Sequence, residues 1–329
     1  MLRTRICDLL GIETPILNAP MGGGSAGGEL AAAVSAAGGL GMIGGMSLGG
    51  ADWLRQQIRL VRERTDRPFG VGFISHRLPR SAELFDVAIE ERVPVIAHSF
   101  ADPAPYMARA RDIGAKVLCQ VRDVEGALEA ARAGVDVIVA QGSEAGGHTG
   151  RISTLPLIPL VVDAVAPLPA IGAGGIGDGR GLAAALMLGA EGAWLGTAFL
   201  TSPESGYSPA QKQRVLEIGP KDTVLSESFD IFGKSSWPQG VAGRAARNEI
   251  SERWHGREDE LRGQLDAVRT QYEEAIRRGD LSVDPVWAGE SAGMVTRSEP
   301  AGETVRRIAA EAERVIAERA RFVLLTGRS

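Results

Sequence analysis

Short apolar runs alternate with Ala- and Leu-rich helical stretches along the first 200 residues, and this alternation constrains the fold more than any other feature. The repeat is about 25 residues long, which suits a strand followed by a helix. Apolar strands separated by helices, with no hairpin turn between them, indicate a parallel sheet covered on both faces. We expect eight strands, at residues 15–20, 41–45, 68–74, 94–100, 116–120, 136–142, 169–175 and 192–199.

The number of strands predicts how the sheet is arranged. Eight strand–helix units within about 200 residues favour closure into a (β/α)8 TIM barrel over an open doubly wound sheet. Beyond the eighth strand the pattern changes, because residues 251–279 and 301–325 are charged, have helical spacing and lack strands between them. We therefore predict a barrel over residues 1–204 and a mainly helical cap over residues 205–329, with a last helix that can dock back on the barrel.

Composition and charge exclude several classes of protein. The apolar fraction of 44% and the charged fraction of 23% are typical of folded, non-membrane domains. A net charge of −5 provides no basic surface for nucleic acid or anionic lipid. Residues 182–200 are apolar enough to suggest a membrane span, but Gly189 and Glu191 divide them, so we expect a buried helix and then a buried strand. We find no export signal and no metal-ligand spacing, and expect a cytoplasmic protein without a metal.

Glycine clusters follow several of the predicted strands. In a barrel of this kind the functional groups lie at the carboxyl ends of the strands. Glycine lets backbone N–H groups approach a ligand because it has no Cβ, and the N-terminus of a helix favours an anion. Asp178 is placed to cap a helix that begins near Gly179. We predict a phosphate site after the seventh and eighth strands, although tight turns alone would also use glycine. The stretches that follow the first, sixth, seventh and eighth strands are residues 20–24, 141–150, 172–180 and 195–199, and three of these four are glycine clusters.

Two long stretches carry a family resemblance. QVRDVEGALEAARAGVDVIVAQGSEAGGHTG (120–150) and PAIGAGGIGDGRGLAAALMLGAEGAWLGTAFL (169–200) resemble the nitronate monooxygenase family, formerly called 2-nitropropane dioxygenases. PILNAPM (15–21) and AGMV (292–295) resemble the corresponding segments, so the similarity spans most of the chain. That family consists of FMN-dependent TIM barrels, in a superfamily that includes flavin-dependent enoyl-ACP reductases and NADH:quinone reductases.

The resemblance implies a bound FMN and names residues that would hold it. One of these residues, Gln120, could contact the flavin or could instead be a polar residue that bonds a neighbouring loop, and we give the two interpretations equal weight. The chain departs from its relatives at Gly72, where they commonly have an asparagine that bonds the flavin. The implied residues are Met21 and Gly22 beside the ring, Gln120 and Gln141 at its polar edges, Gly146 where the backbone approaches it, and Gly174, Gly175, Gly196 and Thr197 around the phosphate.

His148 follows two glycines in a loop expected at the mouth of the barrel. The resemblance implies that it is the catalytic histidine, which would accept a proton from the carbon next to a nitro group or orient the substrate. Glu144 could orient the imidazole or cap the loop backbone. His76 and His98 follow the third and fourth strands, where a histidine either lines the substrate pocket or joins a loop hydrogen-bond network. His255 is expected at the surface or in packing.

Two arginines of the cap have alternative roles. Arg244 and Arg247 could bind an anionic group, or pair with carboxylates and cap helices, and we favour the structural role.

These features together predict an FMN-dependent oxidoreductase, most directly a nitronate monooxygenase that oxidises alkyl nitronates with O2. One alternative is an NAD(P)H-dependent FMN reductase that acts on an enoyl or acyl thioester or a quinone, and another is a non-catalytic flavin-binding barrel. Nitronate-oxidising members tend to have aromatic-lined pockets, so the presence of only three tyrosines favours an acyl thioester as the rival substrate. The expected partners are a small-molecule substrate with O2 or NAD(P)H, and a homo-oligomer is left open.

Overall fold

The computed structural model describes residues 2–47, 49–219 and 221–325, and it contains an eight-stranded parallel sheet. The strand order is β1-β9-β8-β6-β5-β4-β3-β2, and a parallel bridge between Leu17 and Leu40 joins β1 to the start of β2, which closes the barrel. The (β/α)8 fold and all eight predicted strands are confirmed. The strands are β1 (Ile16–Asn18), β2 (Gly41–Gly44), β3 (Phe69–Ile74), β4 (Val95–Ser99), β5 (Lys116–Val121), β6 (Val137–Gln141), β8 (Ala170–Ala173) and β9 (Ala193–Leu195).

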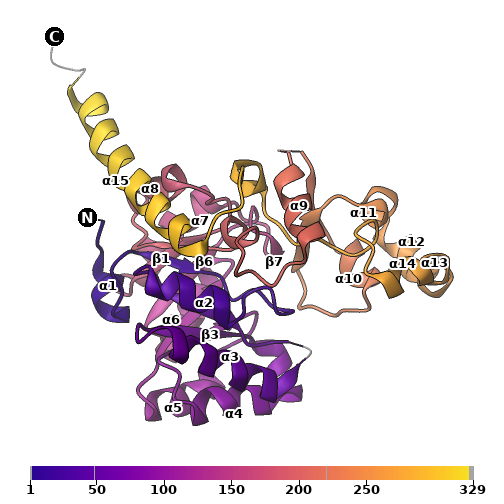
Figure 1. The fold of residues 1–329 in the computed structure, drawn as a ribbon, viewed down its shortest axis with the longest axis horizontal. Coiled ribbons are helices and arrows are strands. Elements are labelled where there is room, and N and C mark those ends of the chain that lie inside the picture. Colours follow the sequence, from indigo (N-terminus) through magenta and orange to yellow (C-terminus); the bar gives the residue numbers. More distant parts are fainter. Residues whose placement is uncertain (1, 48, 220, 326–329) are drawn as a thin grey trace.

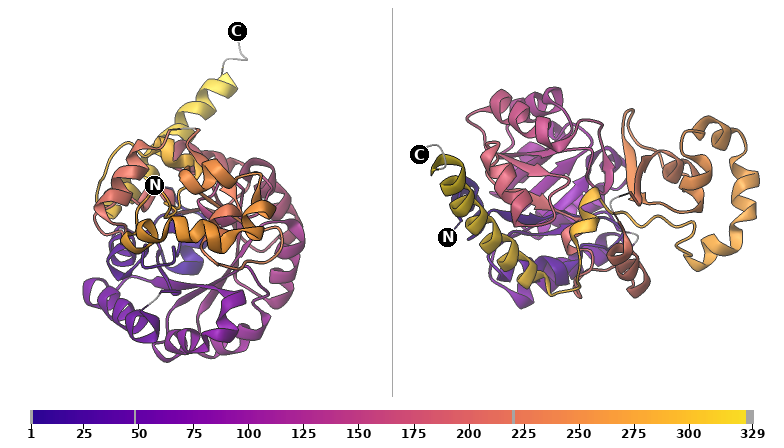
Figure 2. Two further views of the ribbon diagram at one scale, coloured as in Figure 1. Left: turned by 90° about the vertical axis from the view of Figure 1, so that its right-hand side faces the viewer. Right: turned by 90° about the horizontal axis from the view of Figure 1, so that it is seen from above.

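Helices surround the barrel on its outer face (Figure 1; Figure 2, left). The largest apolar core lies between these helices and the outward side chains of the strands. A 3-10 helix, η1 (Ser75–Arg80), follows β3, and another, η2 (Thr197–Phe199), follows β9. The surrounding helices are α2 (Gly28–Ala36), α3 (Gly50–Arg64), α4 (Ala82–Glu90), α5 (Ala104–Asp112), α6 (Val124–Ala133), α7 (Thr154–Val165) and α8 (Gly179–Met187).

The interior of the barrel is a second apolar core. Side chains such as Leu17 and Val139 fill it, and Ile6 and Leu10 of α1 (Arg5–Leu10) pack against them. The start of α1 lies at the amino ends of the strands, because the space beside Gly192, just before β9, is taken by Ile6. Helix α1 therefore plugs one end of the barrel and leaves the carboxyl ends of the strands for a site.

The apolar segment 182–200 divides as the sequence predicted, into the end of α8, the buried strand β9 and η2. Within the described parts of the chain, no helix combines the length and apolar character needed to cross a membrane.

Past the barrel, a small antiparallel sheet of order β10-β11-β7 was not predicted. One of its strands, β7, comes from the glycine-rich stretch that follows β6. The strands are too short to show the alternation that identifies a strand in a sequence, and β11 consists mostly of Gly and Ala. Its strands are β7 (Gly147–Thr149), β10 (Thr223–Ser226) and β11 (Ala242–Ala246).

Short helices complete this part of the chain, which lies beyond one end of the barrel (Figure 2, right). Phe232, Ile250, Trp254, Leu261 and Val268 form a separate apolar core among them. The boundary near residue 204 between barrel and cap stays a prediction. The helices are α9 (Pro209–Glu217), α10 (Ser228–Phe232), α11 (Glu249–Trp254), α12 (Glu258–Gly263), α13 (Leu265–Gln271), α14 (Glu273–Arg278) and the 3-10 helix η3 (Glu290–Met294).

The last helix, α15 (Ala301–Leu325), packs against α8 and α2 (Figure 1). Val305, Ile308 and Ala312 are fully buried in the main core at helical spacing, so one stripe of α15 holds it to the barrel.

We predict that Ile308→Ala lowers the free energy of unfolding by about 2–5 kcal/mol, because it leaves a cavity where α15 meets the barrel core. Urea denaturation followed by circular dichroism measures this change. The control is Val323→Ala on the same helix, where the side chain is 69% exposed and the change should stay within about 0.5 kcal/mol. Equal effects of the two substitutions would contradict the packing of α15.

Candidate functional site

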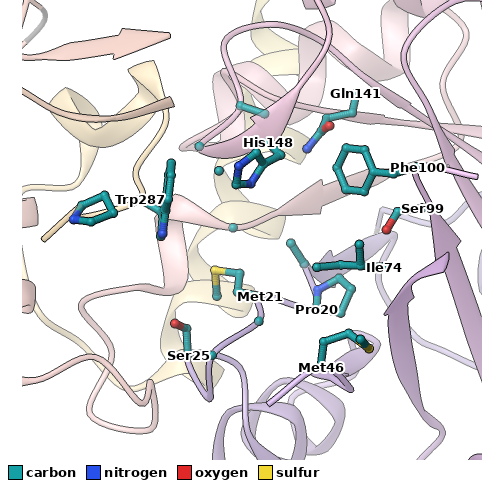
Figure 3. Close-up of a pocket in the computed structure, with 18 of the residues that line it drawn as sticks. Pro20, Met21, Ser25, Met46, Ile74, Ser99, Phe100, Gln141, His148 and Trp287 are labelled. Atoms are coloured by element: carbon teal, nitrogen blue, oxygen red, sulfur yellow. The ribbon is translucent and has the colours of Figure 1, made fainter. Parts of the chain in front are cut away.

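A cavity of about 680 Å³ opens at the carboxyl ends of the barrel strands, beneath the cap. Its size falls in the range of roughly 300–1,000 Å³ that is typical of ligand pockets. In Figure 3, His148 and Gln141 lie on one side of it, Pro20, Met21 and Met46 lie across from them, and Trp287 stands at its edge. All ten residues that the sequence proposed line this cavity: Met21, Gly22, Gln120, Gln141, Gly146, His148, Gly174, Gly175, Gly196 and Thr197.

The two amide side chains of the site contact each other. Nε2 of Gln120 donates to Oε1 of Gln141, across the neighbouring strands β5 and β6. Gln120 thus bonds a neighbouring side chain and also borders the cavity. Both of the interpretations that the sequence left open for Gln120 remain compatible with this position.

The glycines of the predicted phosphate site are of two kinds. Gly174 has a φ of +94°, and a Cβ there would lie 2.8 Å from the carbonyl oxygen of Gly142, so the loop itself requires glycine at this position. Gly196 has an ordinary φ of −103°, and a Cβ there would meet Ala19 and Met21 at 3.6 Å. Of these two glycines, only Gly196 has a backbone conformation that other residues adopt and enough space for a Cβ.

The N-terminus of α8 is occupied by two carboxylates. As predicted, Asp178 caps it, accepting hydrogen bonds from the backbone N–H groups of Arg180 at 2.9 Å and Gly181 at 3.1 Å. Glu311 of α15 accepts another from Gly179 N at 3.0 Å. The helix terminus that the sequence proposed for a phosphate is therefore occupied by side chains of the protein itself. The rest of the predicted phosphate site consists of loop residues 174–176 and the start of η2.

A segment from the far end of the chain closes this part of the cavity. Gly289 N donates to the hydroxyl oxygen of Thr197 at 2.9 Å, and Glu290 N donates to the carbonyl oxygen of Glu144 at 2.9 Å. A Cβ on Gly146 would lie 2.4 Å from Gly289 N. The backbone that approaches Gly146 in this structure is thus residues 288–289, which the sequence analysis did not place here.

His148 stands at the edge of the cavity on β7, where it pairs with Gly243 of β11. Its Nε2 lies 2.8 Å from Oδ1 of Asp230, and both side chains are about nine-tenths buried. The indole of Trp237 stacks on the imidazole with ring centroids 3.5 Å apart and an angle of 14° between the planes. Trp287 lies tilted against it at 5.0 Å.

Sequence reasoning missed Asp230, which is 82 residues from His148 along the chain. It lies on the five-residue helix α10, between two strands that have no recognisable pattern. No signal in the sequence links the two residues. The residue that was considered for this role, Glu144, instead accepts hydrogen bonds from the N–H and hydroxyl of Thr154 at the start of α7, which supports the capping interpretation.

The other histidines have different surroundings. His98 is fully buried, its Nδ1 shares a hydrogen bond of 2.8 Å with the hydroxyl of Ser75, and its ring stacks on Tyr106. Burial lowers the pKa of His98 to about 4. It is therefore a neutral packing group, although it borders the cavity. His76 packs edge-on against Trp237, and burial lowers its pKa as well. His255 is half exposed, 3.6 Å from Glu258.

The two arginines of the cap have structural partners. Arg244 donates to the carbonyl oxygen of Ser143 at 3.0 Å and pairs with Glu290 at 3.0 Å. Arg247 donates to the carbonyl oxygen of Lys221 and pairs with Glu252. The preference for structural roles is thus supported.

The wall of the cavity is aromatic in spite of the few tyrosines. Trp237, Trp287, Phe100, Phe229 and Tyr207 all border it. The argument that a shortage of tyrosine disfavours nitronates is therefore wrong, because tryptophan and phenylalanine supply the aromatic surface.

The space beside Gly72 is filled by Pro20. A Cβ on Gly72 would lie 2.3 Å from Cγ of Pro20, so an asparagine at this position would require the proline to move.

A model of the nitronate monooxygenase family matches residues 3–84 and 81–311. The chain belongs to this family. It is 33% identical to a probable nitronate monooxygenase of Staphylococcus saprophyticus, over 89% of this chain and 93% of that protein. It is an oxidoreductase, which sets aside the non-catalytic alternative.

Two further proteins show the range of the similarity. A 5-hydroxy-7a-methyl-1-oxo-octahydro-1H-indene-4-carboxyl-CoA dehydrogenase of Mycobacterium tuberculosis is 37% identical over 77% of this chain and 68% of that protein. The structure of FabK from Thermotoga maritima superimposes with a TM-score of 0.87 at 35% identity, over 98% of this chain and all of that one. The names of the proteins that this chain resembles thus specify more than one kind of substrate.

We predict that Gly146→Ala lowers the free energy of unfolding by about 1–3 kcal/mol, because the added methyl group would collide with the backbone at residues 288–289. Thermal denaturation of the purified variants measures this. Gly22→Ala is the matched control, since the nearest atom to its Cβ would be 3.4 Å away. An unchanged melting temperature for Gly146→Ala would mean that segment 288–291 does not seal the site.

Proposed function

We propose that the protein is an FMN-dependent oxidoreductase that oxidises alkyl nitronates with O2, with His148 as the base or the substrate-orienting group. The observation that carries the proposal is the His148–Asp230 pair, held at 2.8 Å on the wall of a cavity with aromatic surfaces. The proposal also draws on the similarity to a probable nitronate monooxygenase along most of the chain.

The residues present fit an FMN. A cofactor with a single terminal phosphate suits the compact cradle of residues 174–176 and 196–197, where Gly196 leaves space that a side chain would fill. Met21, Gly22, Gln120 and Gln141 line the same cavity and would contact the ring. When bound, FMN would supply the redox chemistry, while the protein orients the substrate and excludes competing reactions.

The hydrogen bond to Asp230 assigns the two imidazole nitrogens. A carboxylate only accepts, so Nε2 carries the proton and Nδ1 keeps the lone pair that can act as a base. The stacked Trp237 and the tilted Trp287 restrict rotation of the ring. A base of fixed orientation could take the proton from the carbon next to a nitro group, or direct a hydrogen bond to the oxygen atoms of a nitronate once it is protonated.

A second candidate is an NAD(P)H-dependent reductase that acts on an acyl thioester. It is favoured by the similarity to a dehydrogenase whose name specifies a carboxyl-CoA substrate, at 37% identity. Anaerobic mixing separates the two. With propyl-1-nitronate, the yellow absorbance of the protein should bleach, and with NADH it should persist. Bleaching by NADH alone would favour the thioester reductase.

We predict that the purified protein releases FMN, and not FAD, when it is denatured, as measured by chromatography of the released cofactor. Gly196→Val should lose most of this FMN while the protein stays folded, because its side chain enters the proposed phosphate cradle without a backbone clash. Gly174→Val should lose both cofactor and stability, since its backbone is in the left-handed region. Full FMN content in Gly196→Val would refute the cradle.

We predict that His148→Ala keeps its FMN and loses about 10²–10⁴-fold in turnover per bound flavin, the usual contribution of a positioned acid or base. Asp230→Asn should lose less, because an amide oxygen still accepts the hydrogen bond without a charge. His255→Ala, a change at the half-exposed histidine of the cap, is the control. Oxygen consumption and flavin content are measured on one preparation, and turnover of His148→Ala within threefold of wild type would remove it from the catalytic role.

A further inference from the structure

Arg77 borders the same cavity as His148, but it comes from a different part of the chain. It lies on η1, which follows β3, and its side chain is half-buried. Burial lowers its pKa, yet an arginine guanidinium stays protonated at any physiological pH. The wall of the cavity therefore carries a permanent positive charge.

None of the contacts of this guanidinium supplies a full negative charge. One nitrogen donates to the hydroxyl oxygen of Ser235 at 2.8 Å, and the guanidinium carbon lies 4.6 Å from the centre of the Trp237 ring. Asp230 is the acidic group that acts on it electrostatically, but that carboxylate is already hydrogen-bonded to His148. In the described residues, Arg77 forms no ion pair of its own.

A half-buried charge without a counter-ion is costly, and Arg244 avoids this cost by pairing with Glu290. Arg269, which also borders the cavity, resembles Arg77, since it donates to the carbonyl oxygen of Phe232 and lies over the ring of that residue. Arg77 keeps several of its five donors for a partner in the cavity, and it differs from Arg269 because it lies against the indole that stacks on His148. An anion there would offset the desolvation of the guanidinium.

Trp237 relates this position to the reacting centre. Its indole contacts the guanidinium of Arg77 and stacks on the imidazole of His148, and its Nε1 donates to the same Ser235 hydroxyl at 3.1 Å. Arg77 and His148 are thus connected through a single indole ring. One small molecule could reach both groups.

We propose that Arg77, with Ser235 and Trp237, forms a subsite for an anionic group of the substrate that is remote from the reacting carbon. The guanidinium fork matches the planar oxygen pair of a carboxylate and donates to it in a charge-assisted hydrogen bond. The inference deepens the proposed function, on which it rests for the reacting end at His148. Neutral alkyl substrates would leave this subsite unsatisfied.

The test compares binding of butyrate and butyramide, which have nearly the same shape and differ in charge, to the purified flavin-loaded protein by calorimetry. Butyrate should bind at least about tenfold more tightly, as expected for a charge-assisted hydrogen bond, and the preference should weaken as salt is added. The measurement needs no turnover, so it stands apart from the nitronate experiment. Equal affinities, or binding of neither compound, would overturn the subsite.

Variants of η1 locate the effect. Arg77→Gln should abolish the preference for butyrate, whereas Arg80→Gln, an exposed arginine on the same 3-10 helix, should retain it. Arg77→Lys keeps a charge but not the fork, and should weaken butyrate binding severalfold. Melting temperature and flavin content establish that each variant is folded. If Arg77→Gln does not fold, Arg77→Lys decides, and butyrate affinity equal to wild type in that variant refutes the proposal.

Discussion

The pairing of β7 with β11 is the constraint on which the site depends. A three-residue strand in a glycine-rich loop has no stability of its own, and it is ordered here because it forms the edge of a sheet built from the cap. The same pairing places His148 opposite Gly243, where a Cβ would collide with the Trp287 ring at 2.4 Å. The glycine therefore makes room for the aromatic group that lies against the imidazole.

The cap also determines the chemistry of the imidazole. Helix α10 lies between β10 and β11, so the strand pairing that fixes His148 also brings Asp230 to its Nε2. A shift of one residue in the β7–β11 register would turn the His148 side chain to the other face of the sheet. Barrel and cap are thus joined through His148, and the position of this proposed base depends on residues that follow the barrel.

The sequence predicted the barrel well because strand, helix and phosphate-loop signals are local. Eight apolar runs identified eight strands, and Asp178 before Gly179 identified a helix cap that the structure contains. The ten proposed site residues gather at one cavity because they lie at, or soon after, the carboxyl ends of parallel strands, and these ends meet. Their binding and catalytic roles remain predictions. Asp230, Trp237 and β10 could not be predicted, since their importance arises from contacts between segments that lie far apart in the chain.

The docking of α15 bears on where the proposed anion site can lie. Gly179 lacks a side chain where Glu311 and Ala312 of α15 approach the first turn of α8, and a Cβ there would lie 2.5 Å from Cβ of Glu311 and 2.5 Å from the backbone N of Ala312. Glu311 then accepts the hydrogen bond of Gly179 N, beside the Asp178 cap. Two carboxylates at a helix N-terminus stabilise the helix dipole, but they also repel a phosphate. The proposed anion sites therefore lie away from this helix terminus, at the glycine loop after β8, at the start of η2 and at Arg77.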